Sequence, residues 1–204
     1  MNLRYENKLW KQGYDNIAGL DEAGRGSWAG PLVAGIVVLP RKFKIQGIND
    51  SKQLAPLKRQ KLFLQIIKNC LGWSVGIVPH TEIDELGIIR ANSLAFEKAI
   101  SKINLEPDYL IIDGVKIFEP SYEYEFVIKG DAKIASVAAA SIIAKVVRDE
   151  LLKYYAKLYP EYNFQEHKGY GTENHRYALE KHGLSEIHRI TYKPIEEILN
   201  VEIN

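Results

Sequence analysis

The sequence predicts an α/β domain built on a mixed β-sheet that is flanked by helices. Short runs of β-branched and other apolar residues alternate along the chain with longer segments whose apolar residues recur at helical spacing. Apolar residues make up 46% of the 204 residues, so the chain can bury a sizeable core without a disulfide or a structural metal. No repeat or low-complexity tract interrupts this alternation, which is typical of one layered domain.

Five short apolar runs predict the strands. The second run is bounded by Pro31 and Pro40 and the third ends at Pro79, as expected because proline cannot donate to a strand ladder. In chain order the predicted strands cover residues 17–21, 32–39, 73–78, 109–112 and 125–128.

Four longer segments predict helices. The third is ended by Pro160, and the fourth has Thr172 as its N-cap and Gly183 just past its end. The predicted helices cover residues 51–70, 82–103 (as one or two helices), 131–159 and 172–182. We expect residues 1–160 to form the main domain and residues 161–204 to pack on it as a small C-terminal helical segment, within one structural unit.

Composition excludes several classes of protein. The formal net charge is +1, so the overall charge does not itself indicate a nucleic-acid partner. A single cysteine, Cys70, excludes an internal disulfide and fits a reducing compartment. The first 14 residues lack an apolar signal core, and the longest apolar stretch, residues 134–147, is shorter than the ~20 residues that span a bilayer. These features predict a soluble, cytoplasmic protein that does not bind membranes.

Acidic residues follow three of the predicted strands. They are Asp21 with Glu22, then Asp113, and finally Asp131. Carboxylates gathered at one sheet edge repel one another, and two Mg²⁺ or Mn²⁺ ions, which prefer oxygen ligands, would balance four of them. Two such ions can clamp the attacking and leaving oxygens of a phosphodiester.

Simpler interpretations of these acids remain open. An isolated Asp113 is more often a turn residue, and Asp131 could simply cap the long helix. Asp21 and Glu22 point to opposite faces of a regular strand, so both reach one site only if the strand ends or distorts there. Asp149 lies five helical turns, about 27 Å, from Asp131 on a continuous helix, which favours a solvated, salt-bridged face, or a site for backbone phosphates, over a place in the acid cluster.

A glycine-rich segment, Gly24-Arg25-Gly26, follows the first strand. A dinucleotide-binding loop would require a helix next, whereas Pro31 and a β-branched run follow here. Glycines can instead bring bare backbone N–H groups close to a ligand.

Several motifs together resemble the ribonuclease HII family, or type 2 ribonuclease H, over about residues 15–193. The opening motif is Gly19-Leu20-Asp21-Glu22-Ala23-Gly24-Arg25-Gly26, followed by Ala29-Gly30-Pro31. The match continues through Asn49-Asp50-Ser51-Lys52, Ile112-Asp113-Gly114, Lys129-Gly130-Asp131, Ala138-Ala139-Ala140-Ser141-Ile142, Ala144-Lys145, Arg148-Asp149, His167-Lys168-Gly169-Tyr170-Gly171-Thr172 and His188-Arg189.

This resemblance implies a ribonuclease H-like fold with a five-stranded mixed sheet, and a catalytic domain over residues 1–160. It implies endonucleolytic cleavage of RNA in RNA–DNA hybrids and nicking 5′ to ribonucleotides embedded in duplex DNA, leaving 3′-hydroxyl and 5′-phosphate ends. The implied cofactors are two divalent cations, Mg²⁺ or Mn²⁺. The implied catalytic and metal ligands are Asp21, Glu22, Asp113 and Asp131.

The resemblance also implies that Gly24, Arg25, Gly26 and Tyr170 sense the ribose 2′-OH, the group that distinguishes RNA from DNA at one sugar. Four cations are candidate contacts for backbone phosphates, with solvated surface charges as the alternative. They are Lys52, Lys145, Arg148 and Lys168.

The sequence departs from the usual family pattern at three places. Ser27-Trp28 replaces a more typical Pro-Leu-like pair, residues 184–187 replace a Pro-Ser-Pro-x stretch, and Ile190-Thr191-Tyr192 stands where Arg-Ser-Phe is frequent. Trp28 could stack on a substrate or serve as a core aromatic. These departures leave the acids intact but could change substrate preference.

Four of the five histidines fall between His167 and His188, at spacings that fit no zinc pattern. Phosphate contacts, helix capping and core hydrogen bonds are the uses we expect for them. Two rival functions remain, another nuclease on the same fold and a catalytically silent hybrid-binding module. The expected state is a monomer.

Overall fold

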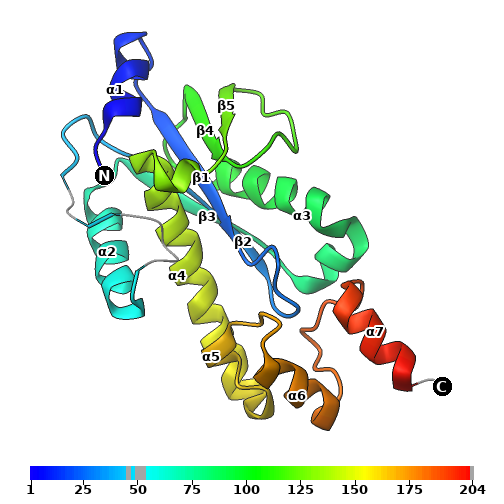
Figure 1. Ribbon diagram of the computed structural model, residues 1–204. Coiled ribbons are helices and arrows are strands. Elements are labelled where there is room, and N and C mark those ends of the chain that lie inside the picture. Colours follow the sequence, from blue (N-terminus) through cyan, green and yellow to red (C-terminus); the bar gives the residue numbers. More distant parts are fainter. Residues whose placement is uncertain (45–46, 49–53, 203–204) are drawn as a thin grey trace.

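The protein contains one five-stranded mixed sheet with helices on both faces (Figure 1). The computed structural model describes residues 1–44, 47–48 and 54–202. The strands are β1 (Ile17–Ala23), β2 (Leu32–Val38), β3 (Gly72–Val78), β4 (Tyr109–Asp113) and β5 (Glu123–Val127). They lie in the order β3-β2-β1-β4-β5, with β2 antiparallel to β1 and β3, and with β4 parallel to both β1 and β5. The predicted fold class is therefore confirmed.

The helices are α1 (Arg4–Lys11), α2 (Pro56–Asn69), α3 (His80–Lys102), α4 (Ala135–Leu158), α5 (Phe164–His167), α6 (Glu173–His182) and α7 (Lys193–Glu202), with 3-10 turns η2 (Gly130–Ala132) and η3 (Pro160–Tyr162). Helices α2, α3, α4 and α6 correspond to the four predicted ones, whereas α1, α5 and α7 were not predicted individually. The helix predicted to begin at residue 131 begins instead at Ala135, because Lys129 adopts a left-handed conformation and η2 intervenes. Helix α1 was not predicted, since its apolar residues are few, yet Leu9 and Trp10 are buried.

Helices α4 and α3 lie directly on opposite faces of the sheet, and three strand glycines allow this close contact (Figure 1). A Cβ on Gly19 of β1 would lie 2.2 Å from the carbonyl carbon of Ser136 in α4. A Cβ on Gly76 of β3 would lie 1.9 Å from the carbonyl oxygen of Ala95 in α3. The close contacts of α4 with Gly19 and of α3 with Gly76 therefore determine which sheet residues face each helix.

The C-terminal segment packs at the carboxyl end of β1. An isolated bridge joins Ala29 to His188, and a separate apolar cluster includes Leu152 of α4, Phe164 and Leu179. Helices α5, α6 and α7 gather at this end of the sheet in Figure 1. Thr172 caps α6 as predicted, since its side chain accepts a hydrogen bond from the His175 N–H. Within the described residues, no helix is long and apolar enough to cross a membrane.

We expect Gly76→Ala to lower the free energy of unfolding by about 3 kcal/mol or more, because the added methyl group meets helix backbone that cannot rotate away. The matched control is Gly72→Ala on the same strand, where a Cβ would lie 3.2 Å from the Leu105 side chain. Urea unfolding of both variants measures the difference. Equal losses would contradict the backbone contact as the cause.

Candidate active site

Asp21 lies near the carboxyl end of β1, on the face that α4 covers. Strand β1 pairs with β4 from Ile17 through Leu20, so Asp21 follows the last of these paired residues. The side chain is 6% exposed, and its Oδ1 accepts a hydrogen bond from the Glu22 N–H at 2.7 Å. A hydrogen bond with Ser141 links this carboxylate to α4.

Strand β1 lacks the distortion that the sequence required for Asp21 and Glu22 to reach one site. The pairing of β1 with β2 continues regularly through Glu22 and Ala23, so the strand does not end at the acids. The opening arises on the other side of β1, where the pairing with β4 has stopped. Glu22 is half-buried and faces a cleft beside the glycine-rich segment.

The acids repel one another. Burial and the charges of Glu22 and Asp113 raise the pKa of Asp21 well above its ordinary value, against the opposing effect of its hydrogen bonds with Ser141 and the Glu22 N–H. Asp21, Glu22 and Asp113 therefore lie close enough for their charges to oppose one another at this sheet edge. A bound cation would relieve this repulsion.

Asp113 and Asp131 are joined through the backbone between them. Asp113 is the last residue of β4, and its Oδ1 accepts a hydrogen bond from the Gly130 N–H at 2.6 Å. This bond holds η2, which carries the buried Asp131, next to β4. In the described part of the chain, no three His, Cys, Asp or Glu side chains converge closely enough to form a ready-made metal site. The donor set is nevertheless the all-oxygen type that Mg²⁺ and Mn²⁺ take.

A cleft of about 460 Å³ connects Glu22 with the glycine-rich segment and Tyr170. Its lining residues come from β1, the following loop, α2, α4 and the loop after α5, and are Glu22, Ala23, Gly24, Arg25, Gly26, Arg59, Lys145 and Tyr170. Gly24 has φ +99° and packs so tightly that a Cβ would lie 2.0 Å from Nε of Arg148. At Gly26 a Cβ would meet open space, so this glycine leaves room above the backbone.

The loop that carries Tyr170 is held by a chain of neutral histidines. The Ser185 N–H donates to Nδ1 of His188 at 2.8 Å, which places the His188 proton on Nε2, 2.9 Å from Nε2 of His175. His175 then carries its own proton on Nδ1 and donates to the Tyr170 carbonyl at 3.0 Å. Burial lowers the pKa of His175 to about 3 and that of His188 to about 4. These histidines therefore serve as core hydrogen-bonding groups, one of the uses predicted for them.

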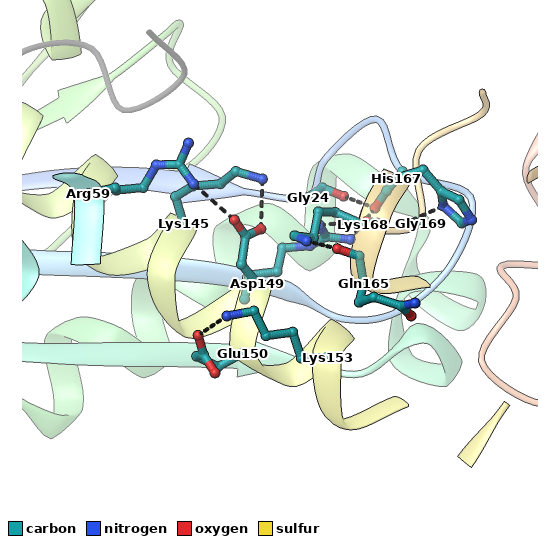
Figure 2. Close-up of polar contacts among 12 residues, drawn as sticks. Gly24, Arg59, Lys145, Asp149, Glu150, Lys153, Gln165, His167, Lys168 and Gly169 are labelled. Atoms are coloured by element: carbon teal, nitrogen blue, oxygen red, sulfur yellow. Dashed lines mark hydrogen bonds and ion pairs between the residues drawn. The ribbon is translucent and has the colours of Figure 1, made fainter. Parts of the chain in front are cut away.

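Two cations that line the cleft, Arg59 and Lys145, form salt bridges with Asp149 (Figure 2). Lys145 Nζ lies 2.7 Å from Asp149 Oδ1, and Arg59 Nη1 lies 3.0 Å from Asp149 Oδ2. Lys145 also lies 5.6 Å from the centroid of the Tyr170 ring. The predicted salt bridges of Asp149 are confirmed, although they are buried rather than solvated.

The prediction that Arg148 contacts backbone phosphates is wrong, because the Arg148 side chain has no exposed surface. Its guanidinium donates instead to the carbonyls of Pro31, Ala29 and Lys168 and to the Ser27 hydroxyl. Lys168 is half-buried, and its ammonium donates to the Gln165 carbonyl (Figure 2). Lys52 lies outside the described residues.

Trp28 packs against the loop that carries Tyr170. A Cβ on Gly171 would lie 2.0 Å from Cζ2 of the Trp28 ring. The backbone N–H of Trp28 donates to the Gly169 carbonyl at 2.8 Å. The guanidinium of Arg176 lies 5.4 Å from the centroid of the indole ring. Of the two uses open for Trp28, these contacts support the packing one.

Sequence reasoning missed three residues around the cleft. Arg59 lines it from α2, and Arg189 and Tyr192 both contact the Arg25 carbonyl. Nothing in the local pattern around Arg59 separates it from the other cations of its helix. The His188-Arg189 motif did single out Arg189. Its partner, the Arg25 carbonyl, lies 164 residues away along the chain, so the motif did not reveal this contact.

Comparisons with known proteins point to a single family. The family model described as Ribonuclease HII matches residues 18–195. A protein of that name from Desulfitobacterium hafniense (strain DSM 10664 / DCB-2) is 47% identical over 98% of this chain and 76% of its own length, and one from Endomicrobium trichonymphae is 45% identical over 96% and 94%.

Solved structures agree with this result. The crystal structure of ribonuclease H2 from Pyrococcus horikoshii OT3 superposes with a TM-score of 0.77 at 30% identity, covering 91% of this chain and 98% of the other. The ribonuclease HII in a complex with PCNA from Archaeoglobus fulgidus gives 0.75 at 26% identity, covering 87% and 95%. A Bst-RNase HIII in complex with Mn²⁺ shares the fold, with a TM-score of 0.69 at 18% identity over 92% and 70%.

The repulsion at Asp21 predicts that Asp21→Asn stabilises the protein in the presence of chelator. Asp21 keeps its proton in the fold at a pH where the unfolded chain has lost it, so folding stability falls as pH rises above the ordinary aspartate pKa of about 4. The stability advantage of the variant should therefore be present at pH 7 and vanish below about pH 4. Thermal unfolding across this range measures it.

The control is Asp15→Asn, which removes an exposed partner of Arg41 and should change stability little. A D21N protein less stable than the original at pH 7 would contradict the repulsion.

Proposed function

The chain belongs to the ribonuclease HII family and is a ribonuclease H hydrolase, and we propose that it nicks duplex DNA 5′ to embedded ribonucleotides as well as cleaving RNA in RNA–DNA hybrids. The products of this cleavage carry 3′-hydroxyl and 5′-phosphate ends. The observation that carries the proposal is the single cleft that joins Glu22 to Gly24–Gly26 and Tyr170. Groups suited to hydrolysis and groups suited to sugar recognition thus line one surface.

Asp21, Glu22, Asp113 and Asp131 would hold two divalent cations, Mg²⁺ or Mn²⁺. When bound, such ions supply an activated water and stabilise the charge that develops on the leaving oxygen. The chain's own contribution is to fix the carboxylates. Ser141 and the Glu22 N–H orient Asp21, while the Gly130 N–H orients Asp113.

Substrate recognition would divide between the sugar and the phosphates. The backbone of Gly24, Arg25 and Gly26 and the hydroxyl of Tyr170 would contact the 2′-OH, which both donates and accepts hydrogen bonds. Lys145, Lys168 and Lys52 would contact backbone phosphates, and Arg59 joins them because it lines the cleft. We further propose that residues 1–160 and 161–204 act as one unit, in a cytoplasmic monomer.

The decisive experiment is a nicking assay on duplex DNA that carries one ribonucleotide, run with Mg²⁺, with Mn²⁺ and with chelator. We expect a metal-dependent nick 5′ to the ribonucleotide and no cleavage of the all-DNA control. Cleavage of both duplexes would refute the sugar-sensing part. Tight duplex binding without cleavage under any metal would instead favour a silent binding module.

In the same assay, Asp113→Asn should lower the nicking rate by at least about 100-fold, since loss even of an outer-shell metal contact lowers activity 10–100-fold. Asn keeps the shape and still accepts from the Gly130 N–H, so the fold should be preserved. Circular dichroism checks the fold. A variant that keeps near-normal turnover would remove Asp113 from the metal ligands.

Tyr170→Phe should lower kcat/KM for the duplex with one ribonucleotide by about fivefold, the strength of one neutral hydrogen bond. The ring stays in place against Lys145 and Arg148, so packing of the loop is retained. Tyr177→Phe, on an exposed side chain of α6, is the control. An unchanged kcat/KM in Y170F would exclude the hydroxyl from sugar recognition.

A further inference from the structure

The backbone of Gly24-Arg25-Gly26 is fixed by two side-chain hydroxyls. Ser27 Oγ donates to the Gly24 carbonyl at 2.9 Å, and the Tyr192 hydroxyl donates to the Arg25 carbonyl at 2.7 Å. Ser27 belongs to the loop itself, whereas Tyr192 comes from the C-terminal segment before α7. Two successive carbonyls of the segment are thus each bound by a separate hydroxyl, and the Arg25 carbonyl also accepts a longer hydrogen bond, of 3.3 Å, from Arg189 Nη1.

Each hydroxyl is in turn held by a buried arginine. Arg148 Nη2 donates to Ser27 Oγ at 2.6 Å, and Arg189 Nη1 donates to the Tyr192 hydroxyl at 2.8 Å. Both arginines are 0% exposed. Because a guanidinium can only donate, it leaves each hydroxyl proton directed at the carbonyl.

The same arginines anchor the loop that follows. Arg148 Nε donates to the Pro31 carbonyl at 2.9 Å, and Arg189 Nε donates to the Gly30 carbonyl at 3.0 Å. Arg189 itself is fixed by its own N–H, which donates to the Trp28 carbonyl. The two hydroxyls therefore bind the segment to a rigid frame rather than to mobile side chains.

The geometry of the peptide bond determines which way the N–H groups of the segment point. The peptide bonds of the described chain are trans, so each N–H points opposite to the carbonyl of the preceding residue. Binding the Gly24 and Arg25 carbonyls on the buried side turns the N–H groups of Arg25 and Gly26 the other way. Arg25 and Gly26 are exposed and line the cleft, so these donors face its interior.

We propose that Ser27 and Tyr192 are positioning residues that set the direction of the Arg25 and Gly26 N–H groups, and thereby the ability of the site to distinguish ribose from deoxyribose. This inference rests on the proposed sensing of the 2′-OH by the glycine-rich segment. Neither side chain is assigned a direct contact with the substrate.

The test measures binding rather than cleavage. Fluorescence anisotropy in chelator gives Kd for a duplex with one ribonucleotide and for the matched all-DNA duplex. We expect Tyr192→Phe and Ser27→Ala each to weaken binding of the ribonucleotide duplex by about fivefold and to leave Kd for the all-DNA duplex unchanged.

Tyr159→Phe is the matched control, because it removes a tyrosine hydroxyl that donates to Glu186, at 3.0 Å, rather than to the glycine-rich segment. Melting temperatures of all three variants check folding. Tyr192→Phe keeps the ring, so it still tests the inference if Ser27→Ala does not fold.

The outcomes separate the two levels of the argument. If the original protein binds both duplexes alike, the proposed 2′-OH sensing fails and the positioning falls with it. If the original protein distinguishes the duplexes and both variants do so equally well, sensing stands and the positioning is overturned. Equal weakening of both duplexes by a variant would indicate general structural damage and would also overturn it.

Discussion

The close contact between α4 and β1 is the constraint on which the rest of the site depends. Because Gly19 has no side chain, the backbone of α4 rests directly on the strand that carries Asp21 and Glu22. The helix then presents Ser141, Lys145 and Arg148 at spacings of four and three residues, which place them along one face. Ser141 reaches Asp21, Lys145 lines the cleft, and Arg148 anchors the loop after β1. One helix thus aligns the acids, the cleft wall and the glycine-rich segment.

Buried charged side chains hold the loops around the cleft because each forms several hydrogen bonds. An isolated buried charge is strongly unfavourable, whereas Arg148 donates to three carbonyls and a hydroxyl. Burial lowers its pKa to about 10, which still leaves it charged at neutral pH. Such a network adds little net stability but is costly to break, so it favours one loop geometry over its alternatives. That property would suit the proposed recognition of a ribose by its single additional hydroxyl.

Local patterns predicted the strands of the sheet well and the long-range contacts poorly. The apolar runs ending at Asp21 and Asp113 identified β1 and β4, because burial on both faces leaves a continuous apolar signature. The start of α4 was misplaced since nothing in the composition around Asp131 reveals the left-handed Lys129. Arg148 was misjudged because a sequence does not tell whether an arginine faces phosphates or backbone carbonyls.

Asp21 and Glu22 are separated from the glycine-rich segment by one residue, Ala23, and this limits how far apart the two can lie. From Glu22 to Gly24 the backbone spans at most about 7 Å, so the distance between the acids of β1 and the proposed sugar-sensing segment is limited by covalent geometry. Only the orientation of the segment remains to be fixed by tertiary contacts, and Arg148 and Arg189 approach it from α4 and from the C-terminal segment. Under the proposed function the C-terminal segment would take part in substrate recognition, because it carries Tyr170, which lines the cleft, and Arg189 and Tyr192, which contact the Arg25 carbonyl. A change in how this segment packs would then alter the direction of the Arg25 and Gly26 N–H groups while leaving the acids in place.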